Sequence, residues 1–347
     1  MKIGILNAQV PFVSGGAEAL ATALRAAFLQ RGYDTDVITI PFKWYPPSHL
    51  LQCMLMSRLV DVTEVNGTRI DRVISLKFPA YFIAHPKNVC WLLHQHRQAY
   101  DLYGTPYSDL WQTPDARTIA AEIRRWDNYY LAKTAAIFTI SQNVSRRLQK
   151  YNGLSSIPLY PPLTDNDFYS GTFERYVFCP GRIDSIKRQH LMIEALGAIP
   201  EPLKAVFSGQ TDSAYAENLR IRIEQLGLSR RVEILGYVSD DQKRTLYANC
   251  LAVYYGVRDE DYGYVTLEAF SAGKPVITHT DSGGPLEFVI DGENGYVTEP
   301  VPALLAECVR NLADSPARAR VLGANGARTL AEKNITWENV IDNLLAP

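Results

Sequence analysis

Short apolar runs alternate with helical patterns along the first half of the chain. The runs typical of buried strands are Lys2–Leu6, Asp36–Ile40, Arg72–Leu76, Asn88–Leu93 and Ala136–Ile140. Two segments, Ala17–Arg31 and Val144–Lys150, carry apolar residues at helical spacing instead. Strands that alternate with helices predict a parallel sheet with helices on both faces.

The alternation breaks between Tyr160 and Gly171, where turn-forming and polar residues gather, and we interpret this segment as an interdomain linker. It then restarts. The later predicted strands are Tyr176–Cys179, Lys204–Ser208, Val232–Leu235, Leu251–Tyr255 and Pro275–Thr278. The later predicted helices are Arg188–Ile199, Ala216–Leu226, Ser239–Ala248, Tyr264–Ala272 and Thr336–Leu345. The pattern predicts an α/β protein of two doubly wound halves, with its chemistry in the cleft between them.

Composition narrows the classes of protein that fit this pattern. The 347 residues are 47% hydrophobic and 21% charged, which is typical of globular proteins and excludes wholesale disorder. The net charge of -2 argues against a dedicated nucleic-acid binder. Five scattered cysteines without a C-x-x-C indicate reduced thiols rather than disulfides or a zinc site. Neither a signal peptide nor a long apolar segment is seen, so we expect a soluble, cytoplasmic protein.

Charge is distributed unevenly between the two halves. Residues 1–168 hold 17 Lys and Arg against 13 Asp and Glu, whereas 169–347 hold 18 against 24. A positive first half suits an anionic partner such as a membrane surface or a phosphorylated acceptor. Chance variation among solvated faces is the alternative interpretation.

The turn after the first predicted strand contains Gly15 and Gly16 directly before a helix. Glycines at this place let backbone N–H groups approach an anion, and the helix N-terminus adds partial positive charge. The loop is longer than the G-x-G-x-x-G of dinucleotide binding and lacks one of its glycines. It predicts an anion-binding loop, with a simple turn as the alternative.

Two cations, Arg182 and Lys187, lie five residues apart between a predicted strand and a predicted helix. From this location both can converge on a diphosphate, the arginine in a bidentate way and the lysine as a point charge. A solvated basic pair is the alternative.

Two glutamates eight residues apart, Glu260 and Glu268, form the sharpest pattern in the chain. The first stands in a loop, where it can accept hydrogen bonds from a sugar's hydroxyls. The second lies in the first turns of a helix, where it can bind a ribose diol, and the amides of Gly263, Tyr264 and Val265 between them can face a phosphate. The alternative is an acidic loop that caps a helix.

Together these elements resemble the retaining GT-B glycosyltransferases, specifically glycosyltransferase family 4. The resemblance rests on the E-x7-E pair, the strand-end cations, the glycine loop and the runs Asp281–Glu287 and Asp291–Gly295. It covers nearly the whole chain and is strongest from 176 to 300.

The resemblance implies two Rossmann-like domains that face each other across a cleft. An N-terminal domain, 1–168, would bind the acceptor, and a C-terminal domain, 169–331, would bind the nucleotide sugar. The final helix, 332–347, would cross back onto the N-terminal domain. The implied reaction moves a hexose from a UDP- or GDP-linked donor to a saccharide or lipid-linked saccharide acceptor. It would need no metal or other cofactor and would serve bacterial surface polysaccharide, lipopolysaccharide or glycolipid synthesis, with peripheral membrane contact through the N-terminal domain.

Residue by residue, the resemblance implies that Arg182 and Lys187 neutralise the donor diphosphate. Glu268 would bind the ribose and Glu260 the hydroxyls of the donor sugar. Tyr237 and Val238 fall where the family packs the base. The other implied donor contacts are Gly15, Gly16, Gly209, Gly263, Tyr264 and Val265.

Two histidines, His94 and His96, end a strand in the first half. The family places a histidine near the donor sugar at this position, and His94 aligns best, with His96 as a second candidate for a sugar or acceptor contact. The pair lacks a third ligand nearby, which argues against a zinc site. A buried structural histidine is the alternative for either one.

The chain departs from the family pattern at two places. Tyr254–Arg258 replaces a Pro-Ser pair after a strand, and Ser208–Thr211 replaces a G-x-G. An NAD(P)-dependent dehydrogenase or epimerase is an alternative function, although the first glycine loop does not fit its motif. A non-catalytic binder of nucleotide sugars is another alternative.

Overall fold

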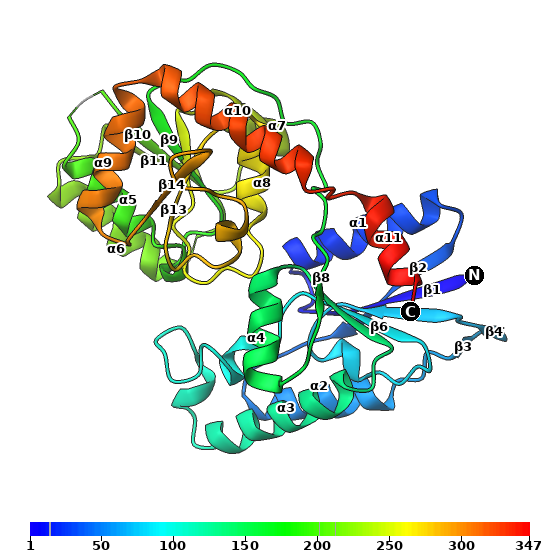
Figure 1. The fold of residues 1–347 in the computed structure, drawn as a ribbon. Helices are drawn as coiled ribbons and strands as arrows, with labels where there is room; N and C mark the ends of the chain where they lie inside the picture. Colours follow the sequence, from blue (N-terminus) through cyan, green and yellow to red (C-terminus); the bar gives the residue numbers. More distant parts are fainter. Residues whose placement is uncertain (14, 201, 212) are drawn as a thin grey trace. The chain divides into compact units, whose positions relative to one another are not determined.

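The computed structural model describes residues 1–13, 15–200, 202–211 and 213–347; Ser14, in the glycine loop, lies outside the described residues. The chain divides into two compact units, 1–164 with 335–347 and 165–334 (Figure 1). The division falls within the predicted linker, near the boundary expected at residue 168.

The first unit is built on a six-stranded parallel sheet of order β2-β1-β5-β6-β7-β8. Its strands are β1 Lys2–Gln9, β2 Asp34–Pro41, β5 Arg72–Ser75, β6 Asn88–Leu92, β7 Ala136–Thr139 and β8 Ile157–Pro158. A short hairpin of β3 Glu64–Val65 and β4 Thr68–Arg69 is separate. The helices are α1 Gly16–Gln30, α2 Ser48–Leu59, α3 Ala116–Leu131, α4 Gln142–Asn152 and α11 Trp337–Leu345.

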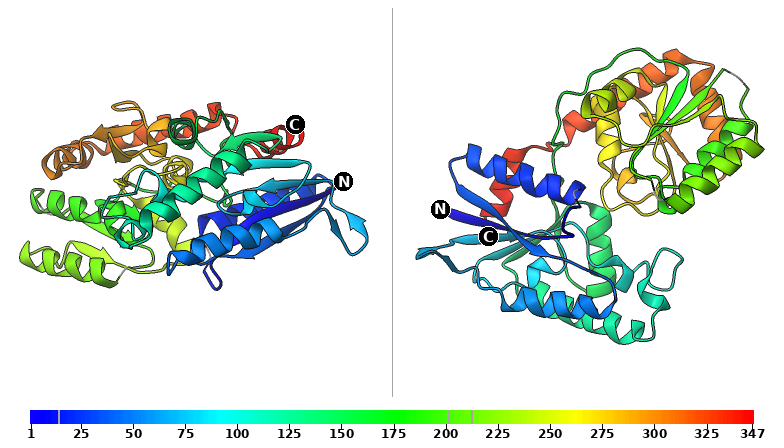
Figure 2. Two further views of the ribbon diagram at one scale, coloured as in Figure 1. Left: turned by 90° about the horizontal axis from the view of Figure 1, so that it is seen from below. Right: turned by 180° about the vertical axis from the view of Figure 1, so that it is seen from behind.

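Helices cover both faces of this sheet. Figures 1 and 2 show α1 and α11 on one face and α2 and α3 on the other. β5 and β6 are buried throughout, as expected for central strands of a parallel sheet. The predicted alternation of strands and helices is therefore confirmed in this unit.

The C-terminal helix α11 belongs to the first unit although it follows the whole of the second. Val340, Ile341 and Leu344 are its buried residues. Arg31, directly after α1, forms an ion pair with Asp342, with 2.7 Å between Nη1 and Oδ1. Apolar burial and this charge pair attach the helix to α1.

The second unit holds another parallel six-stranded sheet, of order β11-β10-β9-β12-β13-β14. Its strands are β9 Tyr176–Pro180, β10 Lys204–Ser208, β11 Val232–Ile234, β12 Ala252–Tyr254, β13 Val276–His279 and β14 Gly295–Thr298. Its helices are α5 Gln189–Gly197, α6 Ser213–Gln225, α7 Asp240–Asn249, α8 Tyr264–Ser271, α9 Pro302–Ala313 and α10 Pro316–Glu332. In Figure 1, α5, α6 and α9 lie on one face of the sheet and α8 and α10 on the other.

Four helices were not predicted: α2, α3, α9 and α10. The interior of α10 contains Gly323 and Gly326, which weaken a helical pattern in the sequence. The structure explains both glycines by close packing against α8 and the turn after it. A Cβ at Gly326 would lie 2.3 Å from the Phe270 ring, and one at Gly323 would lie 2.0 Å from the Gly273 carbonyl oxygen.

Candidate functional site

Three glycines join the loops that follow β9, β10 and β11. The Gly181 N–H donates to the Ser208 carbonyl at 2.9 Å, and the Gly209 N–H donates to the Gly236 carbonyl at 2.7 Å. Gly209 has a φ of +141°, and a Cβ there would lie 2.2 Å from the Gly181 carbonyl oxygen. Only glycine fits this contact, so the loops form one closely packed edge at the carboxyl ends of the strands.

Two predicted residues project from this edge into solvent. Arg182 follows Gly181, and its side chain is 70% exposed, 3.6 Å from the Asp184 carboxylate. Tyr237 follows Gly236 and is 79% exposed, while Val238 beside it is half-buried. An extended guanidinium and an open aromatic face are therefore displayed at the same strand ends.

Lys187 and Glu260 form an ion pair in the second unit. Lys187 closes a 3-10 turn, Ser185–Lys187, whose Asp184 side chain accepts a hydrogen bond from the Lys187 N–H at 3.1 Å. The Lys187 ammonium also donates to the Tyr255 hydroxyl at 3.1 Å, and that hydroxyl donates to Glu260 Oε2 at 2.9 Å. The three side chains make a closed triangle of charge and hydrogen bonds.

The ion pair keeps Glu260 in its charged form. Burial alone would raise the pKa of Glu260, but the charge and hydrogen bond of Lys187 outweigh it, so the pKa lies below the ordinary value. The carboxylate is thus an acceptor of hydrogen bonds and not an acid at neutral pH.

Backbone contacts with the β13–β14 connection hold the loop that carries Glu260. The Glu260 N–H donates to the Ser282 carbonyl and the Gly284 N–H donates to the Glu260 carbonyl, both at 2.8 Å. Arg188 secures the start of the same loop by donating to the Gly256 carbonyl at 2.7 Å. These contacts define the shape of the loop that follows Tyr254–Arg258, one of the two departures from the family pattern.

Arg188 is itself fixed by a carboxylate that the sequence analysis did not single out. Its Nη2 lies 2.6 Å from Asp281 Oδ1 and its Nη1 lies 3.0 Å from Asp281 Oδ2, a bidentate pair. It sits directly after Lys187, with a φ of +54°. Lys187 is therefore held from both the Glu260 side and the Arg188 side.

Glu268 lies in the second turn of α8 and is bound by two side chains of α7. Lys243 Nζ donates to Oε1 at 2.9 Å, and the Tyr247 hydroxyl donates to Oε2 at 2.6 Å. Burial, then Glu260 and then Glu268 raise the pKa of Tyr255 well above its ordinary value. The Tyr255 hydroxyl bonds to Glu260, whereas Glu268 is held by Lys243 and Tyr247.

α8 begins at the predicted glycine. Gly263 is its N-cap residue, with a φ of +91°, and a Cβ there would lie 2.9 Å from the Pro285 ring. Since glycine has no side chain with which to cap the helix, the first-turn N–H groups at Tyr264 and Val265 carry the partial positive charge of the helix end.

In the first unit, the predicted anion-binding loop already holds an anion of its own chain. The Gly15 N–H donates to Glu18 Oε2 at 2.9 Å, and Glu18 Oε1 pairs with Lys77 Nζ at 2.9 Å. The Gly15 N–H is thus bonded to a carboxylate of its own chain, and its role as a donor contact stays a prediction. Gly16 begins α1, and its role stays a prediction.

The two histidines differ in their surroundings. His94 is half-buried, and its Nδ1 lies 2.7 Å from the Gln95 carbonyl oxygen. The His96 ring packs against Phe78 and Phe42, at centroid distances of 5.2 and 6.3 Å. Burial lowers the pKa of His96 to about 3, with a smaller effect from His94. These contacts favour a structural role for His96, whereas the role of His94 near a donor sugar stays a prediction.

Five residues of the clusters above were missed by the sequence analysis: Tyr255, Lys243, Tyr247, Arg188 and Asp281. Lys243 and Tyr247 stand four residues apart on a predicted helix, which puts them on one face. Nothing in the sequence, however, says which carboxylate that face meets.

Within the described part of the chain, no three His, Cys, Asp or Glu side chains are grouped so as to hold a metal ion. No helix among the described residues is both long and apolar enough to cross a membrane.

Comparisons with known proteins match this chain to glycosyltransferases. The family described as "Glycosyl transferases group 1" matches residues 168–329. The "uncharacterized glycosyltransferase MJ1607" of Methanocaldococcus jannaschii is 31% identical over 98% of this chain and 96% of its own length. The Dictyostelium discoideum alpha-1,3/1,6-mannosyltransferase ALG2 is 34% identical over 134 residues. That match covers 37% of this chain and about a third of ALG2, 32% of its length.

Solved structures of low sequence identity share the fold. Anabaena Alr3699/HepE in complex with UDP and glucose has a TM-score of 0.72 and 20% identity over 100% of this chain and 99% of its own. Sucrose-phosphate synthase from Thermosynechococcus elongatus has a TM-score of 0.81 and 16% identity over 99% and 98%. The predicted GT-B class, with two units on parallel sheets, is confirmed.

Proposed function

The chain belongs to the glycosyl transferases group 1 family, and we propose that it moves a hexose from a UDP- or GDP-linked sugar to a saccharide or lipid-linked saccharide acceptor, with retention of configuration. The observation that carries the proposal is the Lys187–Glu260–Tyr255 triangle, together with the exposed Arg182 five residues before Lys187. The match to this family leaves the dehydrogenase alternative without support.

The donor diphosphate is bound by Arg182 and Lys187. Arg182 is extended and can swing onto a phosphate as a bidentate donor, while Lys187 is held in place by Glu260 and Tyr255. Negative charge grows on the diphosphate as the glycosyl bond breaks. Fixed cations therefore stabilise the transition state more than the ground state.

The nucleoside lies over α7 and α8. Glu268, oriented by Lys243 and Tyr247, accepts hydrogen bonds from the ribose diol. The base stacks on the open face of Tyr237 and contacts Val238. The first-turn amides of α8 complete the phosphate site.

The donor sugar is oriented by Glu260, which is ionised and can accept hydrogen bonds from its hydroxyls. His94 contributes from the first unit. We propose departure and attack on the same face of the sugar within an ion pair, in preference to two displacements through a carboxylate nucleophile. Arg182, Lys187 and the helix dipole then stabilise the negative charge of the departing diphosphate without a metal ion.

The acceptor binds to the first unit. The positive balance of residues 1–168 suits a lipid-linked phosphorylated acceptor and peripheral contact with the inner face of a membrane. Synthesis of bacterial surface polysaccharide, lipopolysaccharide or glycolipid is the pathway class that we propose.

Binding and turnover of nucleotides test the proposal. Thermal unfolding is followed with UDP, GDP, ADP and NAD⁺, since a ligand at 100 times its dissociation constant stabilises the fold by about 2.7 kcal/mol. Release of nucleoside diphosphate from matching hexose donors is then measured, and proton NMR of the product gives its anomeric configuration. Stabilisation by one nucleoside diphosphate, followed by a retained anomer, is expected. Stabilisation by NAD⁺ alone would overturn the proposal, and an inverted product would overturn retention.

A further inference from the structure

The first unit holds a cavity at the edge of its sheet opposite to the predicted sites. The cavity has a volume of about 310 Å³, and its lining includes Asn88, the first residue of β6, and Thr134, just before β7. Gly15 and His94 instead follow the carboxyl ends of strands. Because the strands run parallel, the cavity lies at their amino ends, away from the edge that carries Gly15 and His94.

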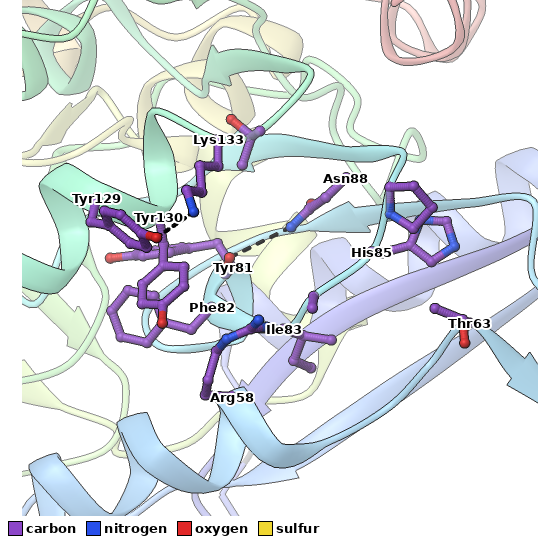
Figure 3. A pocket seen from close by; sticks show the side chains of 13 residues that line it. Arg58, Thr63, Tyr81, Phe82, Ile83, His85, Asn88, Tyr129, Tyr130 and Lys133 are labelled. Atoms are coloured by element: carbon purple, nitrogen blue, oxygen red, sulfur yellow. Dashed lines mark hydrogen bonds between the residues drawn. The ribbon is translucent and has the colours of Figure 1, made fainter.

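Aromatic rings form much of the cavity wall. Phe82 and Tyr130 pack against each other with ring centroids 5.2 Å apart, and Tyr129 lies beside Tyr130 at 4.9 Å. Figure 3 shows these rings gathered on one side of the pocket. Such walls suit the apolar faces of a ring-shaped or aliphatic body.

Two cations enter this aromatic space. Arg58 of α2 lies over the Tyr130 ring, 5.4 Å from its centroid, and Lys133 donates to the Tyr129 hydroxyl at 2.5 Å. In Figure 3 the two side chains reach the rings from opposite sides. The two cations lie against neighbouring rings, because the Tyr129 and Tyr130 centroids are 4.9 Å apart. The hydrogen bond and charge of Lys133, with a smaller effect of Arg58, lower the pKa of Tyr129.

The cavity has no acid to balance these cations. None of its 13 lining residues is Asp or Glu, and among the described residues neither Arg58 nor Lys133 has a carboxylate within ion-pair distance. His85 in the lining uses Nδ1 to accept from the Lys87 N–H at 3.0 Å, and Nε2 faces the Ile70 carbonyl at 3.1 Å. The excess charge therefore comes from Arg58 and Lys133.

We propose that this cavity binds a phosphate monoester, with its phosphate between Arg58 and Lys133 and its body against Phe82, Tyr129 and Tyr130. A phosphate monoester carries nearly two negative charges at neutral pH, enough to balance both cations. Arginine and lysine are the side chains that bind phosphate most often. The site is separate from the proposed donor site and does not depend on the proposed function.

The test is calorimetric titration of the whole chain with glucose 6-phosphate, with glucose as the neutral comparison. The double variant Arg58→Gln/Lys133→Gln should bind the phosphate monoester at least 10-fold more weakly than the unaltered chain. Arg125→Gln is the matched control, because Arg125 lies on α3 but pairs with Glu122 at 2.6 Å on an exposed surface. Lys187→Gln removes a cation from the donor site and should leave this binding unchanged.

Flotation with phosphatidylcholine vesicles, with and without phosphatidic acid, whose headgroup is a phosphate monoester, separates a free phosphate from a lipid headgroup. Binding to anionic vesicles alone, lost in the double variant, would keep the site and identify its source as lipid. Equal binding by the double variant and the unaltered chain, or binding of no probe at all, would overturn the proposal. Unfolding midpoints of the double variant and Arg125→Gln are compared, so that a folding defect is not mistaken for lost binding.

Discussion

Lys243 Nζ lies 2.9 Å from Glu268 Oε1, and this ion pair joins α7 to α8 at the point where we expect a ribose. Both side chains are largely buried, with 27% and 15% of their surfaces exposed. Because the Tyr247 hydroxyl takes the other carboxylate oxygen, the glutamate is oriented before any ligand arrives. Such prior orientation lowers the entropy cost of binding.

Replacing Glu268 by Gln should weaken binding of the preferred nucleoside diphosphate by about 10- to 100-fold, as expected for lost hydrogen bonds to a charged group. Titration calorimetry measures the change. Glu233→Gln is the control, because Glu233 forms an exposed ion pair with Lys204 at 3.1 Å. Equal affinities of both variants for the nucleoside diphosphate would contradict the assignment of Glu268 to the ribose.

Replacing Lys187 by Gln should lower kcat by about 100- to 1,000-fold, by analogy with the loss of one fixed donor to a developing charge. The loss should appear in kcat more than in KM, because the charge on the diphosphate grows as the bond breaks. Steady-state kinetics of nucleotide release test this, with Lys204→Gln as the control. A change confined to KM would contradict the assigned role.

Replacing Gly209 by Ala should destabilise the second unit by about 2 kcal/mol or more, because its Cβ would collide with the Gly181 carbonyl oxygen and its φ is strained. Gly227→Ala is the matched control, with a φ of +68° and no atom within 4 Å of the added Cβ. It should cost only about 1 kcal/mol. Denaturant unfolding compares the two, and equal losses would refute the close contact between the loops.

The stability of the first unit should fall as pH decreases from about 6.5 towards 3 because of His96. Its pKa in the folded chain is about 3, so the unfolded chain binds more protons across this interval. Proton binding therefore favours the unfolded state, and the free energy of unfolding falls as the pH decreases. His96→Phe should reduce this acid sensitivity, since His96 Nε2 has no hydrogen-bond partner among the described residues. Unfolding midpoints of the variant and the unaltered chain are measured across this pH range. The same dependence on pH in both proteins would contradict a role of His96 in acid sensitivity.

Asp127 should produce the opposite slope. It is buried and accepts hydrogen bonds from Tyr81 and Tyr100 at 2.8 and 2.6 Å, and burial raises its pKa to about 7. The folded chain therefore binds more protons between about 4 and 7, and stability falls as pH rises through this range. Asp127→Asn should flatten the slope from pH 4 to 7. A variant with the slope of the unaltered chain would show that Asp127 is ionised throughout.

Many elements of the fold could be predicted from periodicity, because buried parallel strands are short apolar runs and their helices carry one apolar face. The strands β1, β5, β6 and β7 were placed within a few residues. The helix α2 was missed because apolar residues occur on all of its faces, which leaves no clear apolar stripe in the sequence. Three of them, Leu55, Met56 and Leu59, are exposed in the structure. The helix α10 was missed for a different reason, because Gly323 and Gly326 weaken its helical pattern. Glycine is needed at these two positions because they pack closely against Gly273 and Phe270.

The candidate site, too, could be predicted from the sequence only in part. The chemical groups and their spacing along the chain can be read from the sequence: Arg182 and Lys187 at a strand end, and Glu260 and Glu268 around the start of a helix. Their partners become known only from the folded chain. Tyr255 binds Glu260, Lys243 and Tyr247 bind Glu268, and Glu18 occupies the Gly15 amide. Hydrogen bonds and ion pairs act over a few ångströms in space, and the residues that meet at one edge of a sheet come from strands far apart in the chain.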